Sequence, residues 1–395
     1  MTSLARLGPA VRATVPPFHV MDVWAAAGDR ARTHGDLVNL SAGQPSTPAP
    51  TDVRAAARRA LDEQILGYSS SLGTLELRTA IAAHHARRYD DPSVTAADVI
   101  ATTGGSGGFL LAFLAAFDAG DTVVLARPGY PCYRNILTAL GCNVVELPCG
   151  ERTRFQPTVA MLEALDTLPK GLVVASPANP TGSVIEPAEL ENLARWCEEH
   201  GVQLISDEIY HGIEYGGAPP TASAWSTSRE AIVVTSFSKY WSMTGWRLGW
   251  LLVPERLRRA VDVIAGNFTV CPPVPAQYAA LAAFTDAAYA EADAHVERYA
   301  TNRRLLLEGL PELGLTRLAP ADGAFYVYAD VAHLTDDTLA FGRRMLAETG
   351  VAVAPGIDFD PVDGHTWIRL SFAGATEDVT EGLHRLGRWL PTVAP

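Results

Sequence analysis

The chain has 395 residues, of which 48% are hydrophobic and 19% are charged, a composition typical of globular proteins and not of disordered ones. This length exceeds the usual size of a single domain, so we expect two domains. The formal net charge of -13 argues against nucleic acid or an anionic membrane surface as the main partner, because both require a basic surface.

The sequence shows no run of about 18 apolar residues that would predict a membrane span, and its first residues lack the pattern of a secretory signal. None of the five cysteines forms a C-x-x-C pair, and no histidines cluster beside them. We therefore expect reduced thiols, no metal site and a cytoplasmic location.

Short β-rich runs alternate with amphipathic segments through the first two thirds of the chain. The expected strands are 99–102, 122–125, 172–175, 202–205, 232–235 and 250–253. Most are apolar on both faces, as in strands covered by helices on each side. One intervening helix is predicted to begin at Pro187 and to end before Gly201. This alternation predicts an α/β domain with a mainly parallel sheet.

The last third has a different pattern. Residues 276–310 form a long helical stretch, and strand-like segments at 323–328 and 367–372 flank a further helix. We expect a large domain of residues 46–284 and a small α+β domain of residues 1–45 and 285–395.

Ligands in parallel sheets bind beyond the carboxyl ends of the strands, so the residues that follow each strand are the first candidates. The glycine-rich segment 103–108 follows the strand at 99–102 and precedes an apolar helix. Backbone N–H groups at a helix N-terminus favour an anion. The segment lacks the lysine and the spacing of nucleotide-binding motifs. We predict phosphate contacts from Gly105, Ser106 and Gly107.

Aromatic and turn-forming residues follow the next two strands. Tyr130 lies in a proline-rich turn and is placed to stack on a flat ring, whereas Tyr133 is interpreted as a packing residue. Asn179 begins the sequence Asn-Pro-Thr-Gly, which in isolation predicts only a turn.

Asp207 and Tyr210 follow the buried strand at 202–205. In isolation Asp207 is interpreted as a helix N-cap. Its functional alternative is a carboxylate that keeps a pyridine nitrogen protonated, so that the ring accepts electrons from a substrate carbanion. Tyr210 would then donate a hydrogen bond to the ring oxygen.

Lys239 is preceded by Ser236 and Ser238 and followed eight positions later by Arg247. A lysine after a strand is commonly a surface residue. Here two hydroxyls and a guanidinium can hold a phosphate dianion, which leaves the amine free to attack an aldehyde. A phosphate anchor beside a Schiff-base lysine is what pyridoxal 5'-phosphate requires. With this cofactor, Asn179 is expected to bond the ring oxygen and to lower the pKa of the Schiff base.

Strand alternation in 367–372 places Ile368 and Leu370 on one face and Arg369 on the other. A surface arginine is the commoner outcome, but a guanidinium can also hold an α-carboxylate by two bonds. Phe18 and Tyr326 are candidates for a substrate side-chain pocket, or for simple packing.

The order and spacing of these motifs resemble the fold-type I aminotransferases of class I/II, the aspartate-aminotransferase-like family, over essentially the whole chain. The segments that carry the resemblance are 39–45, 67–73, 77–78, 179–182, 207–210, 236–239 and Arg369. The resemblance implies the fold-type I architecture, in which a large domain has a mainly parallel seven-stranded sheet flanked by helices and a small domain is α+β.

The family's cofactor and substrate positions fall on Asn179, Asp207, Tyr210, Ser236, Ser238, Lys239, Arg247 and Arg369. The resemblance further implies that the backbone of Gly43 lies near the substrate carboxylate. It places Tyr68 at the cofactor phosphate of a neighbouring subunit, and so implies a homodimer with shared active sites.

The implied reaction is a ping-pong transfer of an amino group from an α-amino acid to a 2-oxo acid. Lys239 acts as Schiff-base residue and general base, and Asp207 and Tyr210 assist. Aspartate-using bacterial relatives often carry a lysine where Ser106 stands, so both aspartate and a neutral amino acid remain open as substrates.

The same fold also serves carbon–sulfur β-lyases and other elimination enzymes, as well as non-catalytic regulatory domains. The acidic charge and the lack of a basic helix-turn-helix segment argue against the regulatory alternative.

Overall fold

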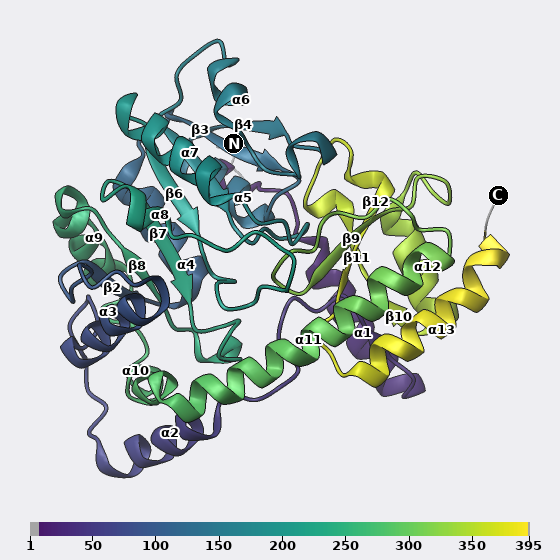
Figure 1. Ribbon diagram of the computed structural model, residues 1–395, viewed down its shortest axis with the longest axis horizontal. Helices are drawn as coiled ribbons and strands as arrows, with labels where there is room; N and C mark the ends of the chain where they lie inside the picture. Colours follow the sequence, from purple (N-terminus) through teal and green to yellow (C-terminus); the bar gives the residue numbers. More distant parts are fainter. Residues whose placement is uncertain (1–7, 394–395) are drawn as a thin grey trace, which may run out of the picture.

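The computed structural model describes residues 8–393, and its centre is a seven-stranded sheet (Figure 1). The strands in spatial order are β2 (Val99–Thr102), β8 (Gly249–Leu252), β7 (Ile232–Ser236), β6 (Gln203–Asp207), β5 (Gly171–Ala175), β3 (Thr122–Arg127) and β4 (Asn143–Pro148). β8 is antiparallel to both neighbours and the other pairs are parallel. The predicted α/β class and mainly parallel sheet are confirmed.

One of the two edge strands of this sheet, β4, is not among the expected strands. Most of its side chains are half-buried or exposed, and Glu146 interrupts its apolar run. Its sequence therefore lacks the pattern of a strand covered on both faces.

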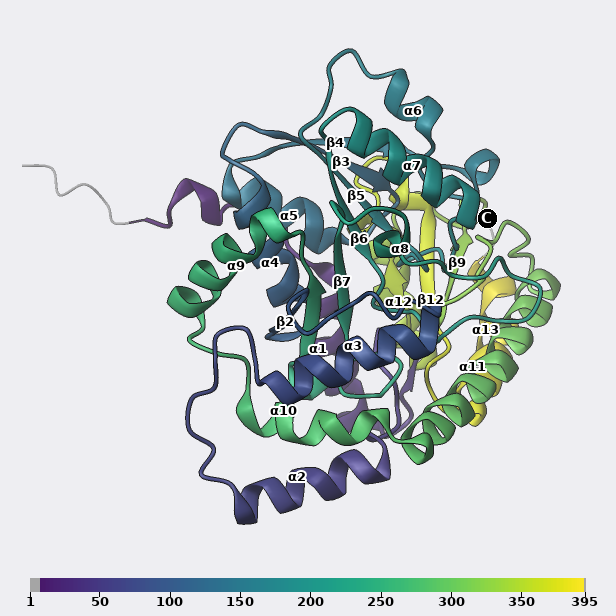
Figure 2. The same cartoon turned by 60° about the vertical axis from the view of Figure 1, so that its left-hand side comes forward.

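Helices cover both faces of the sheet (Figure 2). The helices are α1 (His19–His34), α2 (Thr51–Glu63), α3 (Leu75–Tyr89), α4 (Gly104–Ala116), α5 (Pro131–Leu140), α6 (Val159–Glu163), α7 (Pro187–Glu199), α8 (Ala224–Thr227), α9 (Glu255–Phe268), α10 (Val274–Ala280), α11 (Asp286–Glu312), α12 (Thr338–Thr349) and α13 (Thr376–Val393). On β5, Leu172 and Val174 pack in the cluster that includes α3 and α7, whereas Val173 packs with α4, α5 and α9. No helix in residues 8–393 is long and apolar enough to cross a membrane.

Two smaller sheets lie in the C-terminal part of the fold, and one of them also contains the N-terminal strand β1. β12 (Trp367–Ser371) lies between β11 (Ala354–Pro355) and β9 (Tyr326–Asp330), and β1 (Val38–Asn39) pairs in parallel with β10 (Val351–Ala352). α11 runs from the large sheet to these small sheets (Figure 1). The domain boundaries at residues 45 and 284 remain a prediction.

The helical stretch expected at 276–310 is broken in the structure. A 3-10 turn, Leu281–Phe284, separates α10 from α11, and the Thr285 hydroxyl accepts a hydrogen bond from the backbone N–H of Ala288. This capping bond begins a new helix, although the apolar pattern continues across the break.

Candidate active site

A cavity with an empty volume of about 870 Å³, its open mouth included, lies where the carboxyl ends of β6 and β7 face the small sheet that contains β9 and β12. It brings together residues from segments far apart in the chain. The predicted residues that line it are Gly43, Gly105, Ser106, Tyr130, Asn179, Asp207, Tyr210, Ser236, Ser238, Lys239, Arg247 and Arg369.

Two predicted residues do not line the cavity. Gly107 lies inside α4, where a Cβ atom would collide with the side chain of Thr103. Tyr68 is 87% exposed. Their predicted contacts with the cofactor phosphate stay predictions.

One end of the cavity is suited to a phosphate group. Ser236 Oγ lies 2.9 Å from Ser238 Oγ and accepts a hydrogen bond from the backbone N–H of Ser238. Arg247 packs over Gly104, where a Cβ atom would stand 2.6 Å from Nη2, and the backbone φ of this glycine is +81°. Glycine is therefore required there both for its conformation and for the close approach of the guanidinium.

Asp207 occupies the buried interior of the site. One carboxylate oxygen accepts the backbone N–H of Ile209 at 3.0 Å, and the other accepts the Tyr133 hydroxyl. Burial raises the pKa of Asp207 to about 6, although Tyr133, the Ile209 N–H and Lys239 favour its charged form. No helix begins at Asp207, so the N-cap interpretation is wrong. The interpretation of Tyr133 as a packing residue alone is also wrong.

Lys239 lies beside the segment that contains Gly43. Its Nζ donates to the carbonyl oxygen of Gly43 at 2.7 Å and lies 5.5 Å from the centre of the Tyr210 ring. Burial, and then the charge of Arg369, lower the pKa of Lys239 to about 8. The amine is therefore closer to its neutral, nucleophilic form than a surface lysine is.

Arg369 is 2% exposed, so the commoner outcome for such a residue, a surface arginine, does not apply here. Nη1 donates to Asn179 Oδ1 at 2.9 Å and Nη2 donates to the Ser41 carbonyl at 2.8 Å. Within residues 8–393 no carboxylate forms an ion pair with Arg369, and its Nε has no hydrogen-bond partner. A buried guanidinium of this kind favours an anionic ligand.

The first turns of α1 form a wall of the cavity with Phe18, Val20 and Trp24. The Asp358 carboxylate accepts the backbone N–H groups of His19 and Val20 at 2.9 and 2.8 Å, which fixes the start of this helix. Phe18 was a candidate from the sequence, whereas Val20 and Trp24 were not.

The residues present fit pyridoxal 5'-phosphate. Hydroxyls and a guanidinium lie at the phosphate end, a buried carboxylate is available for a pyridine nitrogen, and an amine of lowered pKa faces the same cavity. This cofactor supplies an aldehyde for the lysine and a ring that withdraws electrons from the substrate α-carbon.

Comparison with known proteins identifies the family. Residues 35–386 match the family model for aminotransferase class I and II. The chain belongs to the class I and II aminotransferases. It is a pyridoxal-phosphate-dependent aminotransferase, so the predicted family, enzyme class and cofactor are confirmed.

Several relatives of this aminotransferase have been named or solved. It is 64% identical to the valine–pyruvate aminotransferase of Mycobacterium tuberculosis over 97% of this chain and 98% of the relative. It is 37% identical to the aspartate/prephenate aminotransferase of Thermus thermophilus, over 95% of this chain and 96% of the relative. A crystal structure of an aminotransferase from Mycobacterium tuberculosis matches with a TM-score of 0.96 at 63% identity, over 98% of this chain and all of the other.

Proposed function

We propose that this aminotransferase moves the amino group of a neutral aliphatic amino acid, of which valine is the type, to pyruvate. The observation that carries the proposal is the set of cations at the cavity. Among the described residues, the lysines and arginines that line it are Lys239, Arg247 and Arg369. With Lys239 and Arg247 serving the cofactor, one guanidinium is left for one substrate carboxylate. A dicarboxylic amino acid would need a second cation.

The cavity wall that contains Phe18, Val20 and Trp24 favours an apolar side chain on the substrate. Phe18 meets the Tyr130 ring edge-on at 6.3 Å, and Val20 and Trp24 continue the same surface. Each methyl or methylene group buried against it would contribute about 0.8 kcal/mol, whereas a carboxylate placed there would lose hydration without gaining a partner. The relative named as a valine–pyruvate aminotransferase supports the same substrate class.

The proposed roles follow from the hydrogen bonds. Arg369 binds the substrate carboxylate, and Lys239 Nζ removes the proton from the substrate α-carbon. Asn179 uses its Oδ1 to hold Arg369, which leaves its amide N–H groups for the cofactor ring oxygen. Tyr210 would donate to the same oxygen, and Asp207 would hold the pyridine nitrogen. The relatives reported above are named as aminotransferases, so neither an elimination reaction nor a regulatory role is proposed.

We also propose a homodimer in which Tyr68 serves the partner's site. Ile65, Tyr68 and Leu75 are exposed in this chain, as are Phe268 and Val270. The two segments are neighbours, because Ser71 Oγ donates to Asp262 Oδ1 at 2.5 Å. Clustered exposed apolar side chains mark an interface. Measurement of the mass of the native protein in solution tests the proposed homodimer.

The substrate proposal is tested by adding single amino acids to the holoenzyme without an oxo acid and following the visible absorbance of the cofactor. Valine should discharge the absorbance faster than aspartate at equal concentration, and pyruvate should restore it. Faster discharge by aspartate would overturn the proposal. The Ser106→Lys variant is the matched comparison, because the added cation should raise the rate with aspartate relative to valine.

A further inference from the structure

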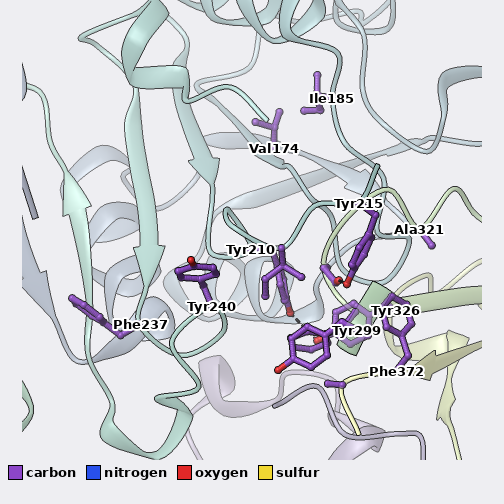
Figure 3. Packing of buried hydrophobic residues seen from close by; sticks show 14 of the residues in the cluster. Val174, Ile185, Tyr210, Tyr215, Phe237, Tyr240, Tyr299, Ala321, Tyr326 and Phe372 are labelled. Carbon is purple, nitrogen blue, oxygen red and sulfur yellow. Dashed lines mark hydrogen bonds between the residues drawn. The ribbon is translucent and has the colours of Figure 1, made fainter. Parts of the chain in front are cut away.

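The hydroxyl groups of Tyr210 and Tyr326 lie 2.7 Å apart inside the cavity (dashed line in Figure 3). Tyr210 follows β6 of the large sheet, and Tyr326 begins β9 of the small sheet. Both side chains are almost completely buried, and each hydroxyl has the other as its hydrogen-bond partner. The Tyr326 hydroxyl also limits residue 43, where a Cβ atom would stand 2.8 Å away.

The direction of this hydrogen bond follows from the number of protons. A tyrosine hydroxyl has one proton to donate. If Tyr210 donates its proton to the cofactor ring oxygen, it must accept from Tyr326. The two hydroxyls then form a chain, Tyr326 to Tyr210 to the ring oxygen, in which each bond polarises and strengthens the next.

We propose that Tyr326 is a positioning residue that acts through Tyr210 and lowers the pKa of the linkage between the cofactor and Lys239. A stronger donor at the ring oxygen stabilises negative charge on that oxygen, so the protonated form of the nearby linkage is less favoured. The inference rests on the roles proposed above for Tyr210 and Lys239, and it adds Tyr326, which would act through Tyr210.

The geometry separates this role from substrate binding. The Tyr326 ring packs against Arg369, whose Cζ lies 4.3 Å from the ring centre. A phenylalanine ring keeps this contact and removes only the hydroxyl. Other ionisable groups at the same cavity are unchanged by that substitution: Tyr130, Tyr133, Asp207, Lys239, Arg247 and Arg369.

The test is a pH titration of the visible absorbance of the holoenzyme. Tyr326→Phe should raise the pKa of the linkage by a few tenths of a unit, because loss of the second bond in the chain weakens the first by roughly 10–30%. Tyr328→Phe is the matched control, because Tyr328 lies on the same strand, is equally buried and has a hydroxyl without a partner. It should titrate as the wild type does.

A second comparison tests whether Tyr326 acts through Tyr210. In the Tyr210→Phe background the added Tyr326→Phe change should have no further effect on the pKa. Equal pKa values for Tyr326→Phe and the wild type, or fully additive shifts in the double variant, would overturn the inference. Borohydride reduction of the holoenzyme that fixes the cofactor to a residue other than Lys239 would instead show that the lysine assignment fails, and the inference with it.

Discussion

Replacing Gly43 with alanine adds one methyl group between the N-terminal segment and the small sheet. The new Cβ atom would stand 2.8 Å from the Tyr326 hydroxyl and 3.7 Å from Arg369 Nη2. The first distance is shorter than a normal contact between a carbon and an oxygen atom, so either Tyr326 or residue 43 must move. Movement of Tyr326 stretches its bond to Tyr210, and movement of residue 43 displaces the carbonyl that accepts from Lys239.

The expected magnitude follows from the cost of overpacking. Inserting a methyl group into a packed site costs about 1–3 kcal/mol. If that cost appears as lost stabilisation of the transition state, kcat/KM for valine should fall by a factor between about 5 and about 150.

The assay is the steady-state rate with valine and pyruvate, together with the thermal unfolding midpoint of each variant. Gly28→Ala is the matched control, since a Cβ atom at this helical glycine meets nothing within 4 Å, and its activity should be unchanged. A Gly43→Ala enzyme with kcat/KM within about twofold of the wild type would refute the reasoning.

Three further predictions follow from the site. Lys239→Ala should abolish transamination of valine, and near-normal turnover in that variant would contradict the assignment of the lysine. Tyr68→Phe should weaken binding of pyridoxal phosphate to the apoenzyme about tenfold if its hydroxyl reaches the partner's phosphate; unchanged affinity in a fluorescence titration would contradict the shared site. Burial raises the pKa of Glu208 to about 7 from the ordinary 4.5, so its contribution to stability is present below pH 4.5 and is lost as the pH rises through 7. The unfolding free energy of Glu208→Gln should therefore rise by roughly 2–3 kcal/mol relative to that of the wild type as the pH goes from 4.5 to 7. Urea titrations that give the same difference between variant and wild type at these two pH values would contradict this prediction.

The sequence predicted the part of the site that follows the parallel strands. Asp207 and Ser236 end neighbouring strands, and Asn179 follows the strand beside them. The carboxyl ends of parallel strands share one edge of the sheet, so position along the chain determines position in space. The apolar runs that predicted these strands therefore also located these side chains.

The parts that were missed depend on contacts between distant segments. The hydroxyl of Tyr133 on α5 reaches Asp207, which is 74 residues away in the chain. Asp358 holds the start of α1 through backbone N–H groups 338 and 339 residues away, and so brings Val20 and Trp24 to the cavity. No local pattern marks either contact, because each joins elements that are far apart in the sequence.

The place of Arg369 depends on the register of the small sheet. β12 pairs with β9 so that Arg369 lies opposite Tyr328, and Ser371 opposite Tyr326. Arg369 and Tyr326 are thus diagonal neighbours on one face, which accounts for the contact between the guanidinium and the ring, while Leu370 packs in the core. A shift of one residue in this pairing would exchange the two faces and bury the guanidinium among apolar side chains. The hydrophobic alternation that holds the small sheet together is therefore also what directs the Arg369 guanidinium into the cavity.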